Sequence, residues 1–232
     1  MQPWHSVALW QLPVGVLVQC FLFTGIFITA HDAMHGTVAP RHPRLNAWIG
    51  RSCTRLFAAL PYDRLQAAHL RHHRRPGTAD DPDFFEHSPS LGSWFWTFMK
   101  RYLTLSQVLG VAALACLWFT LGADWQNVLS FWALPMVMST LQLFVLGTYL
   151  PHRPPVGGFD NPHRARTLPY GWGLSLVTCY HFGYHLEHHT APAVPWWALP
   201  RFRAGRLEPA PLPSHAVSRP RAATTFRPHQ AT

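Results

Sequence analysis

The chain has 232 residues, of which 48% are hydrophobic and only 12% are charged, and it contains 11 Trp. This composition is unusual for a soluble domain and indicates a membrane protein. The net charge of +9 would suit nucleic acid, but the basic residues flank apolar stretches, so anionic lipid headgroups are the better partner. The four Cys show no C-x-x-C spacing, and nothing indicates disulfides or thiolate metal ligands.

Three stretches are long and apolar enough to cross a bilayer, which takes roughly 20 residues. They are residues 7–30, 102–122 and 127–150, and none contains Lys or Arg. The first is too long for a cleaved signal peptide and no positively charged region precedes it, so we expect a retained helix.

The distribution of Lys and Arg predicts how these helices are oriented. Residues 31–101 hold ten of them and the segment after residue 150 holds the other nine, whereas the loop at 122–126 holds none. By the positive-inside rule the N-terminus faces outward, both basic regions face the cytoplasm, and the second and third spans form a hairpin.

Two shorter helices are predicted between the first and second spans. Residues 45–60 carry apolar side chains along one stripe and Arg51 and Arg55 opposite, which is typical of a helix lying in the membrane interface. Pro61 then begins a second helix, and Pro76 ends it.

The C-terminal part is organised differently. Residues 172–189 contain an apolar stretch that is too short to cross a bilayer. Residues 201–232 are rich in Pro, Arg and Ala without periodicity, which predicts a disordered tail. We therefore expect one membrane domain, residues 1–200, of all-α class with about three transmembrane helices and additional interfacial helices.

Three clusters of histidine are the strongest functional signal in the chain. Within each cluster the spacing is i to i+3 or i+4, which on a helix stacks side chains on one face about 5 to 6 Å apart at Cβ. Two imidazoles placed in this way can bind one metal ion. The clusters are His31 and His35; His69, His72 and His73; and His185, His188 and His189.

Eight imidazoles exceed what one tetrahedral zinc ion uses, so two metal ions in a histidine cage are the economical interpretation. The zinc-peptidase pattern H-E-x-x-H fails because Leu186 stands where Glu is needed, and the inverted pattern fails because Tyr184 stands where His is needed. A redox metal with nitrogen ligands and open positions can activate O₂, which zinc cannot do. We therefore expect two non-haem iron ions, with the clusters on the cytoplasmic side.

Several strings around the clusters resemble the bacterial β-carotene ketolases, which are carotenoid 4-oxygenases of the membrane fatty-acid desaturase and hydroxylase superfamily. The resemblance runs from about residue 17 to residue 200. The triple cluster identifies only the superfamily, whereas the flanking strings favour the ketolase branch over the fatty-acid desaturases. These strings are Phe27-Ile-Thr-Ala-His31-Asp-Ala-Met-His35-Gly, Gly77-Thr-Ala-Asp-Asp-Pro-Asp-Phe84, Phe144-Val-Leu-Gly-Thr-Tyr-Leu-Pro-His152-Arg-Pro, His181-Phe-Gly-Tyr-His185 and Val194-Pro-Trp-Trp197.

The resemblance implies an O₂-dependent reaction at the allylic ring carbon C4 of a carotenoid. Two hydroxylations at this carbon followed by loss of water would give a ketone, converting β-carotene to echinenone and canthaxanthin, and zeaxanthin to astaxanthin. It also implies a bacterial inner membrane as the location and lipid as the medium from which the substrate enters. Electrons must come from another protein, because the chain has no Rossmann glycine pattern, flavin motif or Fe–S cysteine set. We expect a ferredoxin-type donor.

The resemblance adds further residues to the candidate site. His152 matches an additional ligand position that the superfamily carries after its last span. His163 and His181 resemble family residues near the site, and for them we expect a role in supporting the ligands or the structure rather than metal binding, which stays open as an alternative. Asp32, Glu187 and Asp81 are expected to accept hydrogen bonds from ligand N–H groups and to fix the imidazole tautomers.

Some alternatives stay open at this stage. Ketolases of this type carry a further apolar segment before the first histidine cluster, and the chain starts too late to hold it, which suggests a wrong start, a truncated gene or a three-span form. A carotenoid hydroxylase, a fatty-acyl desaturase or, less simply, a membrane metal-binding or transport protein could use the same histidines. Arg71, Arg74 and Arg75 could help an acidic electron donor to dock, although contact with lipid headgroups is the simpler interpretation.

Overall fold

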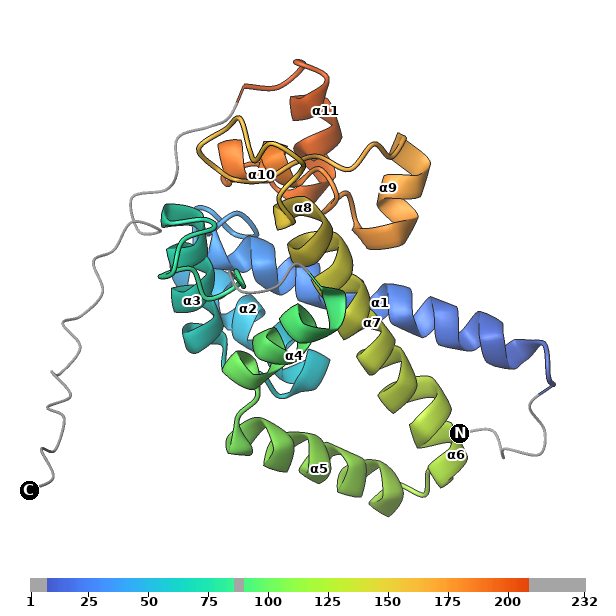
Figure 1. The fold of residues 1–232 in the computed structure, drawn as a ribbon. Coiled ribbons are helices and arrows are strands. Elements are labelled where there is room, and N and C mark those ends of the chain that lie inside the picture. The colour runs from blue at the N-terminus through green and yellow to red at the C-terminus, as the bar shows by residue number, and fades with distance from the viewer. Residues whose placement is uncertain (1–7, 86–89, 209–232) are drawn as a thin grey trace, which may run out of the picture.

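A computed structural model of the chain describes residues 8–85 and 90–208. Within these residues all regular structure is helical, which confirms the predicted all-α class (Figure 1). The first half contains α1 (Gln11–Met34), α2 (Pro43–Ala58), α3 (Tyr62–Arg74), α4 (Leu91–Tyr102) and α5 (Leu105–Thr120). The second half contains α6 (Trp125–Val128), η2 (Leu129–Ala133), α7 (Leu134–Phe144), η3 (Val145–Tyr149), α8 (Leu150–His152), α9 (Trp172–Cys179), α10 (His185–Thr190), η4 (Trp196–Ala198) and α11 (Leu199–Arg203).

Two helices of the described chain are long and apolar enough to cross a membrane. They are α1, with 24 residues, and the continuous helix Trp125–His152, with 28 residues, which correspond to the first and third predicted spans. The second predicted span is the 16-residue helix α5. It passes the same test only together with α4, from which it is bent by 87°.

Polar side chains hold α1 against the long helix that runs from α6 to α8. The hydroxyls of Thr24 and Ser139 lie 2.8 Å apart in a buried position, which satisfies two groups that lipid could not. Pro135 has no N–H to offer to the carbonyl of Phe131, one turn earlier, and the side-chain amide of Gln19 donates to this carbonyl instead at 3.2 Å. The π-helical turn η2 includes Phe131 and lies just before Pro135, where the missing N–H interrupts the regular α-helical hydrogen bonds.

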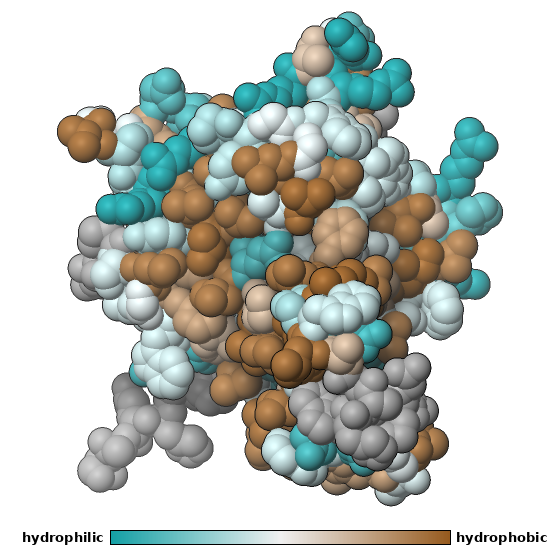
Figure 2. All heavy atoms as spheres, turned by 90° about the vertical axis from the view of Figure 1, so that its right-hand side faces the viewer, coloured by the Kyte–Doolittle hydropathy of each residue, from teal (hydrophilic) through white to brown (hydrophobic). Residues whose placement is uncertain are grey.

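The face that contains α1, α7 and α9 is largely apolar (Figure 2). Large exposed side chains on these helices include Leu17, Leu22, Val137, Leu141 and Val177. So much exposed apolar surface is unstable in water but suits hydrocarbon. The apolar face therefore marks the surface that contacts the lipid.

The helix predicted at residues 45–60 is α2, which packs against α1. It ends where Ala59 adopts a left-handed conformation with φ 54°. Pro61 precedes α3, as predicted, and fixes the start of this histidine-bearing helix. Gly50 brings α2 close to Tyr62, because a Cβ at Gly50 would lie 2.2 Å from Cε2 of the tyrosine ring.

The C-terminal segments lie over the ends of α1 and α8 (Figure 1). Residues 172–189 contain two helices, α9 and α10. Between them Tyr180 and His181 have φ of 48° and 61°, a left-handed conformation that is uncommon for such residues. Most of the predicted disordered tail, residues 209–232, lies outside the described residues, and the domain boundary at residue 200 stays a prediction.

We expect Gly50→Ala to lower the stability of the protein by about 1 to 3 kcal/mol, because the added methyl group collides with Tyr62 and displaces α3 from α2. Thermal unfolding in detergent micelles measures the effect. Gly92→Ala is the matched control: a Cβ at this exposed helical position meets nothing within 4 Å, so stability should stay equal or rise slightly. Equal losses in both variants would contradict the close packing of α2 on Tyr62.

Candidate metal centre

The nine predicted metal ligands lie together where α1, α3, α8 and α10 meet. The first pair comes from the end of α1, three more from α3, one from the last residue of α8 and three from α10. Most are almost completely buried, and only His69 and His73 are partly exposed. Burying this many imidazoles is costly unless their nitrogen atoms are bound to something.

The nine side chains form two groups, in each of which the ligand nitrogens lie within 4.8 Å of one another. We call the first the five-histidine group; it consists of His31, His35, His69, His73 and His188. The second, the four-histidine group, consists of His72, His152, His185 and His189. The sequence predicted which residues gather, and the structure shows how they are divided.

The Nε2 atoms inside each group converge on one point. In the five-histidine group the Nε2 atom of His69 lies 2.8 Å from that of His35 and 3.1 Å from that of His73. In the four-histidine group the Nε2 atom of His185 lies 2.9 Å from that of His152 and 3.2 Å from that of His189. Nitrogens bound to one ion at about 2.1 Å are separated by roughly 3.0 to 3.4 Å, so both groups fit a metal ion.

The electrostatics of the groups also suit metal binding. Burial, followed by repulsion from neighbouring imidazoles, lowers the pKa of His69, His73 and His188 well below the usual value, and that of His35 to about 3. These four imidazoles of the five-histidine group are therefore neutral at physiological pH, with a lone pair free for an ion. Both ring nitrogens of His31 are buried without a hydrogen-bond partner among the described residues, which leaves its Nε2 free for the same ion.

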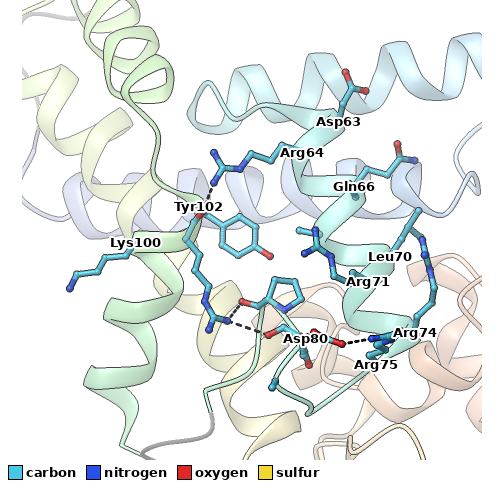
Figure 3. A pocket seen from close by; sticks show the side chains of 16 residues that line it. Asp63, Arg64, Gln66, Leu70, Arg71, Arg74, Arg75, Asp80, Lys100 and Tyr102 are labelled. Carbon is cyan, nitrogen blue, oxygen red and sulfur yellow. Dashed lines mark hydrogen bonds and ion pairs between the residues drawn. The ribbon is translucent and has the colours of Figure 1, made fainter. Parts of the chain in front are cut away.

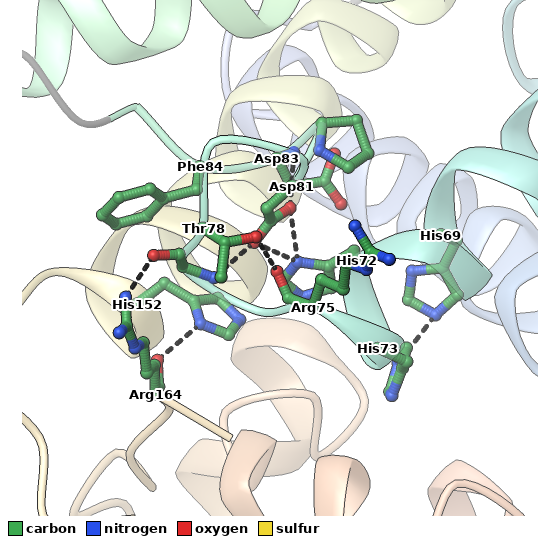
Figure 4. A network of polar contacts seen from close by, with 12 residues as sticks. His69, His72, His73, Arg75, Thr78, Asp81, Asp83, Phe84, His152 and Arg164 are labelled. Carbon is green, nitrogen blue, oxygen red and sulfur yellow. Dashed lines mark hydrogen bonds and ion pairs between the residues drawn. The ribbon is translucent and has the colours of Figure 1, made fainter. Parts of the chain in front are cut away.

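Asp81 orients His72 from the side opposite the metal site (Figure 4). The Nδ1–H group of His72 donates to the Asp81 carboxylate, with 2.9 Å to each oxygen. Burial alone would lower the pKa of His72, but this hydrogen bond and the charges of Asp83 and Asp81 raise it above the usual value. The same contact keeps the pKa of Asp81 low despite its burial. His72 is therefore fixed in the tautomer that presents Nε2 to the four-histidine group.

The loop that carries Asp81 is fixed by several contacts. The N–H groups of Gly77 and Asp83 donate to its two carboxylate oxygens at 2.7 and 2.8 Å. Arg101 donates to three carbonyl groups of the same loop, those of residues 81, 82 and 84. Trp94 donates its ring N–H to the carbonyl of Asp83 at 2.8 Å. In the sequence, Arg101 was counted only among the basic residues that predict the orientation in the membrane. Its contacts with the loop were not foreseen, because no sequence pattern shows that a side chain about 20 residues away binds backbone carbonyls.

His152 is positioned by the segment that follows it. Its Nδ1–H group donates to the carbonyl of Arg164 at 2.8 Å, which leaves Nε2 facing His185. Arg164 in turn donates to the carbonyl of Gly77, so it connects His152 with the Asp81 loop (Figure 4). A lone histidine after a span carries no spacing signal, so only the family resemblance identified His152.

The two other expected orienting carboxylates have different partners. The Asp32 carboxylate accepts the backbone N–H of Trp196 at 3.0 Å, and its other oxygen lies 3.5 Å from Nδ1 of His31, which is too long for a strong hydrogen bond. Glu187 accepts from the Thr167 hydroxyl and lies 3.6 Å from Arg203. Both therefore connect the metal-binding helices to the C-terminal segments.

His163 and His181 belong to neither group. The ring centroid of His163 lies 6.0 Å from that of His189. His181 is buried and stacks on Tyr184 at 5.5 Å. The role of both residues stays a prediction.

One apolar residue that sequence reasoning did not single out lies against the histidines. The ring centroid of Phe182 lies 4.6 Å from that of His31 and 5.1 Å from that of His185, so it contacts both groups. Gly147 leaves the room for it, because a Cβ there would lie 2.4 Å from Cε1 of Phe182. An apolar wall beside two metal positions excludes water, which suits oxidation of an apolar substrate.

The chain is similar to several known proteins. A family model for fatty acid desaturase matches residues 4–111 and 93–220. A β-carotene ketolase of Paracoccus sp. (strain PC1) is 42% identical over 210 residues, which cover 86% of each chain. A β-carotene ketolase of Haematococcus lacustris is also 42% identical and covers 85% of this chain and 64% of that protein. A zeaxanthin 4-ketolase of Chlamydomonas reinhardtii is 44% identical over 79% of this chain and 42% of that protein.

We expect Asp81→Asn to weaken metal binding at the four-histidine group by about 10 to 100-fold, because an amide no longer fixes the tautomer of His72. Metal analysis by mass spectrometry after dialysis against a graded chelator series measures the loss. Asp80→Asn is a close control, since Asp80 is exposed and pairs with Arg75 instead. If both variants keep as much metal as the wild type, Asp81 does not orient a ligand.

Proposed function

Since the chain belongs to the fatty acid desaturase family, and within it to the β-carotene ketolases, we propose that it oxidises C4 of a β-ionone ring to a ketone. β-Carotene is the expected substrate, with echinenone and canthaxanthin as products, and zeaxanthin is a second substrate that would give astaxanthin. The observation that carries this proposal is the pair of buried histidine groups in a chain 42% identical to a β-carotene ketolase over most of its length.

The residues present fit two iron ions. His31, His35, His69, His73 and His188 would hold one ion, and His72, His152, His185 and His189 would hold the other. Nitrogen-only ligand sets with this many imidazoles suit iron better than hard cations such as magnesium or calcium. When bound, the two irons supply the activation of O₂.

The reaction balances with two electrons for each oxygenation. One atom of O₂ becomes a hydroxyl group at C4, and the other leaves as water after taking up two electrons and two protons. A second round at the same carbon gives a geminal diol, which loses water and leaves the ketone. We propose a ferredoxin-type donor for the electrons, because the chain carries no flavin, nicotinamide or Fe–S motif.

The chain's own residues bring the substrate to the metals and keep water out. A carotenoid dissolved in lipid meets the apolar face of α1, α7 and α9 directly, without passing through water (Figure 2). Phe182 lies between His31 and His185 and gives the site an apolar wall. Asp81 and the carbonyl of Arg164 hold the protons of two ligands at Nδ1.

We place the protein in the bacterial inner membrane with the histidine groups on the cytoplasmic side. The support is the distribution of Lys and Arg, which are concentrated in the segments that carry the histidines and absent from residues 102–150.

Expression of the chain in bacteria that accumulate β-carotene tests the proposed reaction. We expect carotenoids in which oxygen replaces two hydrogens, detected by liquid chromatography with mass spectrometry, and labelled when ¹⁸O₂ is supplied. His72→Ala and His188→Ala should each abolish the product, because each removes a nitrogen from one histidine group. Asp80→Asn should retain it.

A tag assay for membrane protein and an iron assay make the outcomes distinct. Hydroxylated carotenoids without ketone would assign the chain to a hydroxylase reaction. Desaturated fatty acids with unchanged β-carotene would assign it to the acyl desaturases. Unchanged β-carotene with abundant, iron-loaded protein would reject β-carotene as the substrate.

A further inference from the structure

A groove with a volume of about 1140 Å³ lies between α3 and α4, beside the loop that carries Asp81 (Figure 3). Its walls come from the exposed side of α3, from the end of α4 and from residues 79–82. None of the large hydrophobic side chains that are exposed in the described residues lines it. The groove is therefore distinct from the apolar face that contacts lipid.

The groove is strongly basic. Its cations are all exposed, and they are Arg64, Arg71, Arg74, Arg75, Lys100 and Arg101. Of its three carboxylates, Asp63 pairs with Arg51 and Asp80 with Arg75, while Asp81 accepts from His72. Arg71 and Arg74 have no acidic partner among the described residues, and the side chain of Arg101 hydrogen-bonds to carbonyl groups while its charge also acts on nearby Asp83. The groove consequently presents an excess of positive charge.

The inner wall of the groove leads directly to the metal centre. Asp81 lines the groove and hydrogen-bonds His72, whose Nε2 atom lies 3.1 Å from that of His189 in the four-histidine group. One carboxylate and one imidazole thus separate the groove from a metal position.

We propose that this groove is the docking site of an acidic one-electron carrier protein, of the iron–sulfur class, that reduces the metal centre. The proposal rests on the proposed function, because an O₂-dependent oxygenase needs two electrons per turnover from outside the chain. Each docking event oxidises the cluster of the carrier by one electron and reduces the metal centre by one. Two such events and two protons complete the reduction of the second oxygen atom to water.

Position and charge favour a protein carrier over a lipid headgroup. To bind an anionic headgroup, the protein needs only positive charge near the membrane surface. Basic residues elsewhere in the chain also supply such charge. A carrier also needs an aqueous surface close to the metal ions, and the groove combines its charge with the contact between Asp81 and His72. Steering by several exposed cations also suits a transient partner, which must dissociate after each electron.

The test compares two variants of the full chain in nanodiscs of phosphatidylcholine, a lipid without net charge. Arg71→Glu/Arg74→Glu reverses two groove cations. Arg41→Glu/Arg44→Glu reverses two exposed cations of the segment before α2 and of its first turn, which do not line the groove. The probe is an acidic plant-type [2Fe–2S] ferredoxin, and its affinity is measured by biolayer interferometry without turnover. Iron content and thermal stability are measured for each variant.

We expect the groove variant to weaken ferredoxin binding roughly tenfold or more, and the control variant to have much less effect. High salt should weaken binding to the wild type and abolish the difference between the variants. In turnover the KM for ferredoxin should rise in the groove variant while kcat at saturating ferredoxin stays close to wild type. Arg71→Ala/Arg74→Ala provides a second, milder variant if the charge reversal prevents folding.

Equal effects of the groove and control variants would overturn the proposal, because net charge alone would then explain binding. It would also be overturned if the groove variant bound ferredoxin normally but lost stabilisation by added phosphatidylglycerol, which would identify a headgroup site. Groove-dependent ferredoxin binding without keto product from β-carotene would support docking while rejecting the proposed substrate. Keto product with ferredoxin binding unaffected by the groove would reject docking alone.

Discussion

The convergence of nine imidazoles, seven of them almost completely buried, on two points is the constraint on which the rest of the structure depends. A neutral imidazole has one N–H donor and one acceptor nitrogen, so two facing Nε2 atoms need a shared proton or cation between them. The Nε2 atom of His69 faces both His35 and His73, and one proton can serve only one of these contacts. Hydrogen bonding among the rings cannot satisfy the cluster, whereas one metal ion in each group can.

The division of the clusters links distant helices. On α3, His69 and His73 are four residues apart and join the five-histidine group, while His72 points to the four-histidine group. On α10, His185 and His189 are four residues apart and join the four-histidine group, while His188 belongs to the five-histidine group. Each helix therefore gives two ligands to one group and one to the other, so neither group is complete unless both helices are in place. This reciprocal arrangement accounts for the many contacts that hold the loop of Asp81 and the start of α3.

The sequence predicted the helical class, both long spans and the residues that gather, because apolar length and histidine spacing are local properties. The division into two groups depends on how α3 and α10 face each other, which no local pattern contains. Asp81 was among the expected orienting carboxylates, but its pairing with His72 depends on the loop conformation, which is held by the N–H of Gly77 and by Arg101. The bend between α4 and α5 was missed because no Gly marks it, and the turn at Tyr180 was missed because its left-handed positions hold Tyr180 and His181 rather than Gly.

The two reactants that the proposed chemistry needs have opposite solubilities, and the fold keeps their routes apart. The apolar face of α1, α7 and α9 suits a molecule that stays in lipid, and Phe182 gives the histidine groups an apolar wall beside His31 and His185. The basic groove between α3 and α4 suits a charged protein from the aqueous phase, and its lining includes Asp81, which accepts a hydrogen bond from His72. Electrons can therefore enter through a polar contact while the carbon to be oxidised remains in a medium from which water is excluded.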